Sequence, residues 1–271
     1  MNKSILLFFP LWFLATASQA GSTKDAEVLA QAHTWQMEFR AGKQEVVKPL
    51  IKSLEDAVAQ SPDNAQLWEA LGHAYMAKQG ALYVMPLDVP ALIANGELAR
   101  DAYAHSLALN GKGALSRAGH GMSTMVVSQL KGDGPGMAAG VDEMNTAVRQ
   151  APNSTAVRLT RGFTIIHLPP GMRDTNAVIE DLGFILDTAP GGRPEDVLHV
   201  LLGDLYAETG KLDDARGQYR QVTGASAFAA EQVKTRLIDL EKGSITPASI
   251  AAVRSGTGTR CAMCHAPGTD N

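Results

Sequence analysis

The feature that most constrains the fold of this chain is a helical pattern that is interrupted at regular intervals. Apolar residues recur at steps of three and four, as in Val47, Leu50, Leu54 and Ala57, whereas alternating strand-like runs are scarce. Stops rich in Pro or Gly fall near residues 62, 111, 152 and 190, at intervals of roughly 40. A fixed period of this length indicates stacked helical hairpins, with a generic helical bundle as the alternative.

Two segments carry the fullest version of the repeat. One reads Trp68-x2-Leu71-Gly72-x2-Tyr75 followed by Ala99-x3-Tyr103, and the other reads Leu202-Gly203-x2-Tyr206 followed by Ala215-x3-Tyr219. These segments resemble tetratricopeptide repeat (TPR) proteins. The resemblance implies an all-α fold, an α-α superhelix of about four to five TPR-like helical hairpins over residues 21–243. Small residues at the Gly and Ala positions would then lie where paired helices cross.

Weaker units follow the same rule. One unit has Gly121 with Gly140 and Met144, a second has Gly162 with Val178 and Leu182, and a partial unit has Leu50, Leu54 and Ala57. Three units also carry extra residues between their paired helices, at Gln79–Ile93, Lys131–Met137 and Leu168–Thr175. We expect these insertions to line one edge of the superhelix, where they either serve function or are simply tolerated.

The first twenty residues are typical of an export signal. Lys3 is positive, Ile5 to Ala15 form a short apolar run that includes Pro10, and small residues precede Gly21. The run is too short for a membrane span, which needs about 20 apolar residues. We therefore expect residues 1–20 to be a cleaved signal peptide and the mature protein to be periplasmic.

The last segment, residues 244–271, combines a helix candidate, a flexible joint and a compact motif. Cys261-x-x-Cys264-His265 is the attachment signature of c-type haem, and the surrounding residues resemble the haem-binding segment of c-type cytochromes. Cys261 and Cys264 would form thioethers to one porphyrin, and His265 would be the proximal iron ligand. A bare disulfide or a relic motif remains as the alternative, because a zinc site would need another protein ligand and a redox pair a strand-then-helix context.

Six residues of the sequence follow the motif, so we expect no complete cytochrome fold after it. Either the sixth iron position is open or another part of the protein supplies a ligand. By analogy with the TPR groove, the residue after each conserved Gly and the one three further on should face a concave surface. These positions are His73 and Met76, Met122 and Met125, Phe163 and Ile166, and Asp204 and Ala207.

His and Met are the residue types that commonly complete haem iron, so the distal candidates are Met76, His73, Met122 and Met125. Met is also a common core residue in helices. His105, His120 and His167 are lesser candidates, and His199 stands where Trp68 stands in its own unit, which favours a packing role.

Composition excludes several classes of function. The net charge is −4 with no basic run, which argues against a nucleic-acid binder, and two Cys cannot build a disulfide scaffold. No catalytic motif stands out. The sequence therefore favours an exported adaptor that carries one covalent haem c and exchanges electrons with a protein partner in its groove. The alternatives are an interaction scaffold with the haem structural or absent, and a haem sensor or peroxidase.

Overall fold

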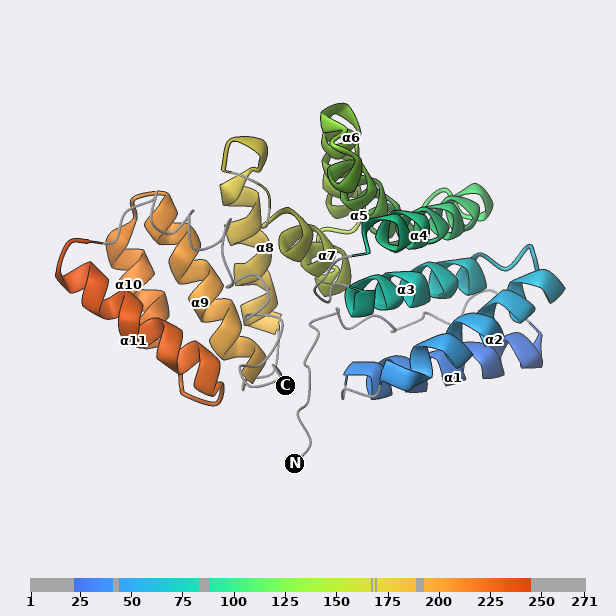
Figure 1. Cartoon of the computed structure of the whole chain (residues 1–271), viewed down its shortest axis with the longest axis horizontal. Helices are drawn as coiled ribbons and strands as arrows, with labels where there is room; N and C mark the ends of the chain where they lie inside the picture. Colours follow the sequence, from blue (N-terminus) through green and yellow to red (C-terminus); the bar gives the residue numbers. More distant parts are fainter. Residues whose placement is uncertain are drawn as a thin grey trace. The chain divides into compact units, whose positions relative to one another are not determined.

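A computed structural model describes residues 22–40, 44–82, 88–166, 168, 170–188 and 193–244 (Figure 1). The described chain falls into two compact units that divide between Arg161 and Gly162. We call residues 22–161 the N-terminal unit and residues 162–244 the C-terminal unit, and we describe each by itself.

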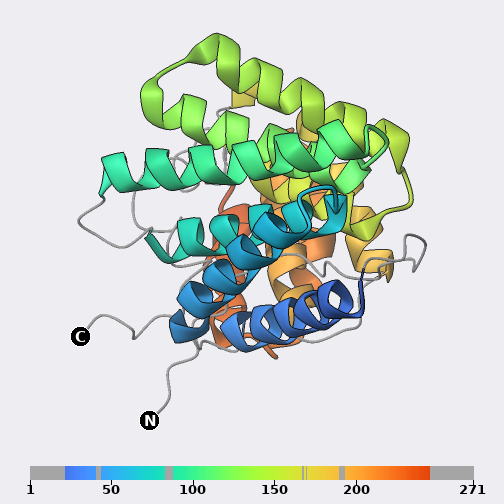
Figure 2. The same ribbon diagram turned by 90° about the vertical axis from the view of Figure 1, so that its right-hand side faces the viewer.

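The N-terminal unit is a succession of antiparallel helix pairs. Its elements are α1 (Thr23–Arg40), a 3-10 turn (Gln44–Val46), α2 (Val47–Gln60), α3 (Ala65–Leu82), α4 (Val89–Leu109), α5 (Ala114–Lys131), α6 (Gly134–Gln150) and most of α7 (Thr155–Ile165). Helices α1 to α6 lie in chain order in both views (Figures 1 and 2). Leu50, Leu54 and Ala57 of α2 are buried in the core that α2 shares with α3 and α4, as predicted for the partial first unit.

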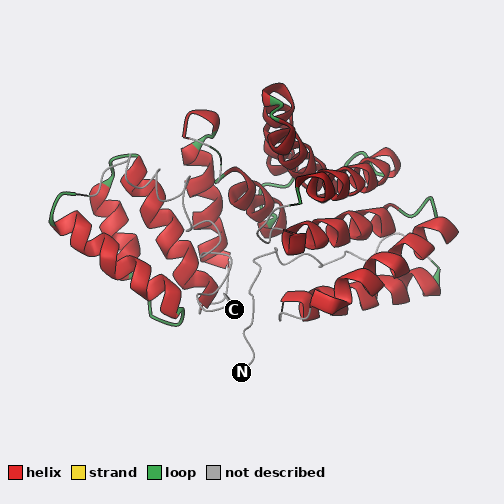
Figure 3. Ribbon diagram, viewed as in Figure 1, coloured by secondary structure: helices red, strands yellow, loops and turns green. Residues whose placement is uncertain are grey.

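The C-terminal unit continues the same alternation. After the end of α7 come a 3-10 turn (Pro170–Met172), α8 (Thr175–Thr188), α9 (Arg193–Glu208), α10 (Leu212–Arg220) and α11 (Ala227–Glu241). Every regular element in the described ranges is a helix (Figure 3). The predicted all-α class is therefore confirmed.

Glycines mark the helix crossings, as the sequence predicts. A Cβ atom on Gly72 of α3 would lie 2.7 Å from the Tyr103 ring of α4, and one on Gly203 of α9 would lie 2.2 Å from the Tyr219 ring of α10. A Cβ on Gly121 of α5 would lie 2.6 Å from the carbonyl oxygen of Gly140 on α6. Real Cβ atoms do not approach other atoms this closely, so the helices can pack at these distances only because the side chain is absent.

The turns before α3, α5 and α7 repeat one another closely. The backbone N–H of Asn64 donates to Ser61 at 3.1 Å, that of Gly113 to Asn110 at 2.9 Å, and that of Ser154 to Ala151 at 3.0 Å. Six residues after each stop, a side chain on the new helix donates back to the turn. The pairs are Trp68 Nε1 to Pro62 O at 2.9 Å, Arg117 Nη2 to Gly111 O at 3.0 Å, and Arg158 Nε to Pro152 O at 2.6 Å.

Two of the three sequence insertions lengthen helices in the described ranges. Helix α3 runs on to Leu82 and α4 begins at Val89, with residues 83–87 outside the described ranges. Between α5 and α6 only Gly132, at φ 70°, and Asp133 intervene. The Asp133 side chain accepts from the Gly136 N–H at 3.1 Å, so the Gly-Pro-Gly sequence becomes the first turn of a capped helix. The third insertion contains the 3-10 turn Pro170–Met172.

Candidate functional site

The candidate site is the face formed by α3 and α5, the first helices of two successive hairpins. His73 follows Gly72 on α3, and its side chain is half-buried. Its Nδ1 lies 2.5 Å from the hydroxyl oxygen of Tyr103, which is fully buried on α4. The two rings meet edge to face, with centroids 5.3 Å apart. One face of His73 is therefore turned toward its own hairpin, where it satisfies a buried phenol.

The equivalent residue of the last hairpin shows the same arrangement. Asp204 follows Gly203 on α9, and it accepts a hydrogen bond from the Tyr219 hydroxyl at 2.7 Å. Arg236 of α11 donates to both oxygens of Asp204, and the whole group is buried. Burial by itself would lower the pKa of Arg236, but the Asp204 charge outweighs it and raises that pKa. The sequence expectation that Asp204 faces a groove is wrong, because Tyr219 and Arg236 enclose it.

The polarity of the residue after the Gly at each helix crossing thus depends on one position of the paired helix, the position of Tyr103 in α4 and of Tyr219 in α10. Where that position is tyrosine, as at Tyr103 and Tyr219, the inner residue is polar, namely His73 or Asp204. Where it is apolar, as at Met144 and Leu182, the inner residue is Met122 or Phe163 respectively. A buried hydroxyl needs a hydrogen-bond partner, which accounts for the polar choice.

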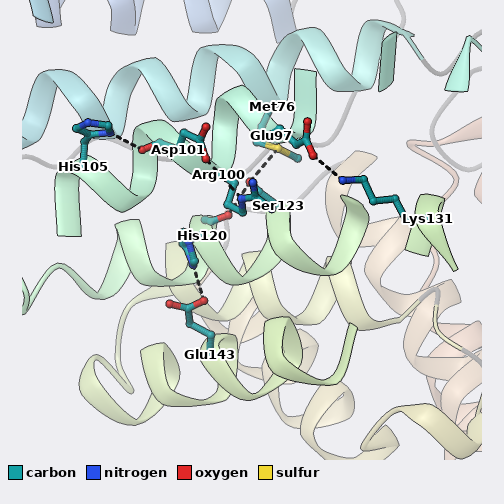
Figure 4. Close-up of polar contacts among 10 residues, drawn as sticks. Met76, Glu97, Arg100, Asp101, His105, His120, Ser123, Lys131 and Glu143 are labelled. Atoms are coloured by element: carbon teal, nitrogen blue, oxygen red, sulfur yellow. Dashed lines mark hydrogen bonds and ion pairs between the residues drawn. The ribbon is translucent and has the colours of Figure 1, made fainter. Parts of the chain in front are cut away.

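The positions three residues further along are all buried. Met76 is 5% exposed, Met125 is 3%, and Ile166 and Ala207 are lower still. The Met76 sulfur accepts from the Ser123 hydroxyl at 3.4 Å (Figure 4), and Met125 packs where α5 crosses α6 at Gly140. Of the four distal candidates, His73 and Met122 are half-buried, and Met122 packs against the core of the preceding hairpin. The structure therefore brings His73, Met76 and Met122 to one region, with Met125 turned toward α6.

Glu69 is a functional candidate that the sequence analysis missed. It lies one helical turn before His73 on α3 and is half-buried. The Ser116 hydroxyl of α5 donates to its Oε2, and Ser116 in turn lies 2.8 Å from the Ser106 hydroxyl of α4. Burial raises the pKa of the Glu69 carboxyl. Burial, with the Glu69 charge as a second cause, also raises the pKa of Tyr103.

Three further histidines of the described ranges have other contacts. His120 Nδ1 lies 2.6 Å from Glu143 Oε2 across α5 and α6 (Figure 4). His105 stacks on the Trp68 ring at 4.4 Å, and His199 Nδ1 lies 2.8 Å from Gln218 Oε1. A packing role for His199 is thus consistent with its contact to the paired helix.

The haem-attachment residues Cys261, Cys264 and His265 lie outside the described residues, as do His167 and the expected signal peptide. In the part of the chain that the structure describes, no three His, Cys, Asp or Glu side chains gather in a way that could hold a metal ion. No helix of the described ranges is long and apolar enough to cross a membrane.

Comparison with known proteins supports the repeat assignment. No protein-family model matches the sequence, and no curated protein matches it. Among solved structures, the chain is similar to a thermophilic TPR protein of Thermus thermophilus, with a TM-score of 0.51 and 14% sequence identity. The match covers 80% of this chain and 99% of that chain. The fold is TPR-like. At this identity the similarity establishes the fold and leaves the function to be argued from the site.

Proposed function

We propose that this chain is an exported TPR-like adaptor that binds a protein partner and carries one haem c on its C-terminal segment. The observation that carries the proposal is the Cys261-x-x-Cys264-His265 motif on a TPR-like chain whose first twenty residues are typical of an export signal. The adaptor would pass electrons to its partner or receive them from it.

The partner-binding part of the proposal follows from the TPR-like scaffold. Stacked helical hairpins present the first helices of successive units as one continuous surface, which repeat proteins use for binding. On α3 and α5 this surface offers half-buried side chains of different chemistry, including Glu69, His73 and Met122. Such a mixture suits a protein segment better than a small metabolite, which would need an enclosed cavity.

The haem part of the proposal follows from the donor set. The Cys261 and Cys264 thiols would hold the porphyrin covalently, and the His265 imidazole would bind the iron. When bound, the group supplies one-electron chemistry, and the chain itself provides attachment, one axial ligand and partner docking.

Expression with the haem-attachment machinery tests this part directly. We expect a covalently bound haem on denaturing gels and a pyridine-haemochrome spectrum with the band of two thioethers. A variant with Cys261→Ser and Cys264→Ser should lose both signals while keeping the same helical circular dichroism. A wild-type protein without covalent haem would contradict the haem proposal and favour the interaction scaffold.

A second spectroscopic test concerns the sixth iron position. Single changes to Ala at His73, Met76, Met122 and Met125 should be compared in the ferrous and ferric states. We expect the low-spin signature to be lost in one variant, and the half-buried Met122 is the best-placed candidate because it lies nearer solvent than Met76 or Met125. A high-spin spectrum in the wild type, or no change in any variant, would refute ligation from this face.

Partner binding is tested by placing a photo-crosslinking residue at Met122 on α5 and, as a control, at the exposed Ala104 on α4. Crosslinking in the periplasm should join Met122, and not Ala104, to one protein species. Equal products from both positions would contradict docking on the α3 and α5 face.

A further inference from the structure

Glu69 is a half-buried carboxylate with no cation beside it among the residues that the structure describes. Its hydrogen-bond partner in the described ranges is Ser116, whose hydroxyl donates to Oε2. The hydroxyl and the backbone N–H of Ser116 favour the charged form of Glu69, but burial outweighs both and raises the pKa of the carboxyl. No Lys, Arg or His of the described residues forms an ion pair with Glu69, and no positive charge contributes to that balance.

Three other carboxylates of the described chain show how such burial is compensated. Asp204 accepts a two-pronged pair from Arg236, and Glu208 pairs with the buried Arg173. Asp25 accepts from the Ser61 hydroxyl and from the Asn64 amide, both at 3.0 Å. Buried charges are normally paired or fully hydrogen-bonded because dehydration is expensive. Glu69 differs from all three, because a single serine is its partner.

The surroundings hold this carboxylate in one place. Ser106 is buried and donates to the Ala65 carbonyl at 2.9 Å, while its oxygen lies 2.8 Å from that of Ser116. Ser116, itself buried, donates its hydroxyl proton to Glu69. The hydroxyl pair thus fixes one carboxylate oxygen against α5. A preorganised acceptor of this kind loses little entropy when it binds a donor.

Glu69 also lies where a partner would meet the chain. It stands on α3 at the contact with α5, and His73 is the next residue along the same helical stripe. Neither the helix nor the turn requires a carboxylate here, since the Ser116 hydroxyl could donate equally well to a neutral amide oxygen.

We infer that Glu69 is the anchor for a positively charged side chain, Lys or Arg, of the protein partner that docks across α3 and α5. The inference rests on the proposed partner-binding function and specifies its chemistry. A cation supplies both things that Glu69 lacks, namely a donor from a second residue and a compensating charge. Because the carboxylate is already partly dehydrated, the bond is stronger than one at a fully exposed glutamate.

The test uses the full-length protein and the isosteric variant Glu69→Gln, which keeps an acceptor for Ser116. Glu97→Gln is the matched control, because Glu97 carries the same charge on α4 and pairs with Lys131 at the surface. The first probe is n-propylguanidinium, with n-propylurea as its neutral counterpart. The carboxyl carbon-13 signals of the glutamates are followed during each titration, with the Glu69 signal assigned by its absence in the variant.

We expect n-propylguanidinium to shift the Glu69 signal saturably and n-propylurea to leave it unchanged. The second probe is a degenerate 12-residue peptide library with a fixed central Arg, selected on the immobilised protein. Selected peptides should lose about tenfold or more of their affinity for Glu69→Gln and bind Glu97→Gln as they bind the wild type.

Several outcomes would overturn the inference. They are no saturable shift at Glu69, equal shifts with the urea, or peptides that bind Glu69→Gln as well as they bind the wild type. A lower urea midpoint for Glu69→Gln than for the wild type would show that the carboxylate serves the fold instead. These results would leave the haem spectrum and the Met122 crosslink unaffected, so they are distinguishable from a failure of the proposed function itself.

Discussion

Replacing Gly203 by Ala should destabilise the C-terminal unit far more than the same replacement elsewhere in its helices. The new Cβ would lie 2.2 Å from Cε1 and 2.5 Å from Cδ1 of Tyr219. The ring would have to move by more than about 1 Å to reach ordinary contact distance. It cannot move freely, because its hydroxyl donates to Asp204 and the Asp204 carboxylate is held by Arg236.

The magnitude follows from these two constraints. Overpacking costs about 1–3 kcal/mol, and a broken hydrogen bond to a charged group costs about 1.5–3 kcal/mol. Replacing Gly by Ala inside a helix returns about 0.5–1 kcal/mol. The net loss for Gly203→Ala is therefore about 2–5 kcal/mol. At Gly217 of α10 a Cβ would meet nothing within 4 Å, so Gly217→Ala should instead gain up to about 1 kcal/mol.

Urea unfolding followed by two signals measures the difference. Of the three Trp residues, Trp12 lies in the expected signal peptide and Trp35 and Trp68 lie in the N-terminal unit, so the fluorescence of the mature protein reports that unit while far-ultraviolet circular dichroism reports both. Gly203→Ala should lower the circular-dichroism midpoint, and Gly217→Ala should not. Equal midpoints for the two variants would refute the close crossing of α9 and α10.

Three further predictions concern other parts of the chain. Arg236→Met leaves the buried Asp204 carboxylate without its cation, so urea unfolding should show a loss of about 3–5 kcal/mol. The hydrogen bond from Asn64, with those from Ser61 and Ser22, outweighs burial and lowers the pKa of Asp25 in the folded state. Its carboxylate therefore stabilises the fold above the unfolded pKa, and this is lost as the pH falls through the folded pKa. Asp25→Asn should accordingly lower the urea midpoint at neutral pH but not in strong acid. Intact mass of the exported protein should place the first residue at Gly21; retention of the preceding residues would contradict signal cleavage.

The repeat architecture was predictable because its determinants are local and periodic. A small residue at Gly72 or Gly203 and an aromatic residue on the following helix belong to one hairpin. Their contact depends on the geometry of two adjacent helices alone. The stops at each turn are equally local, since Pro and Gly act on the backbone where they stand. The insertions were harder to interpret, because extra residues can extend a helix as readily as a loop.

Arg117 and Arg158 show what the sequence pattern concealed. They occupy the position of Trp68 and make its hydrogen bond to the preceding turn, although they share neither its shape nor its hydropathy. What the three side chains have in common is an N–H donor that can reach a carbonyl oxygen six residues earlier. A search for donors six positions after each Pro or Gly stop would have found all three. It would also have strengthened the two weaker units.

The directions in which the side chains of the candidate site point depend on residues of the paired helix, which the local sequence does not show. His73 and Asp204 were expected to face a groove because of their place after a conserved Gly. The hydroxyls of Tyr103 and Tyr219, on the paired helices, decide where they point. Glu69 was missed for the opposite reason, since nothing in its local sequence marks a carboxylate that will be dehydrated without a cation.

The tyrosine contacts of His73 and Asp204, together with the serine contact of Glu69, indicate which side chains are available to bind a partner. A polar residue after the conserved Gly is recruited by a tyrosine of its own hairpin, so its charge or hydrogen bond is already used in the folded chain. Glu69 lies on the same helical stripe as His73, but its hydrogen-bond partner is a serine, which brings no charge. Binding energy available to a partner comes from groups whose needs the fold leaves unmet. On the α3 and α5 face, Glu69 is a carboxylate without a charged partner among the described residues, and a basic side chain of a partner would supply that charge.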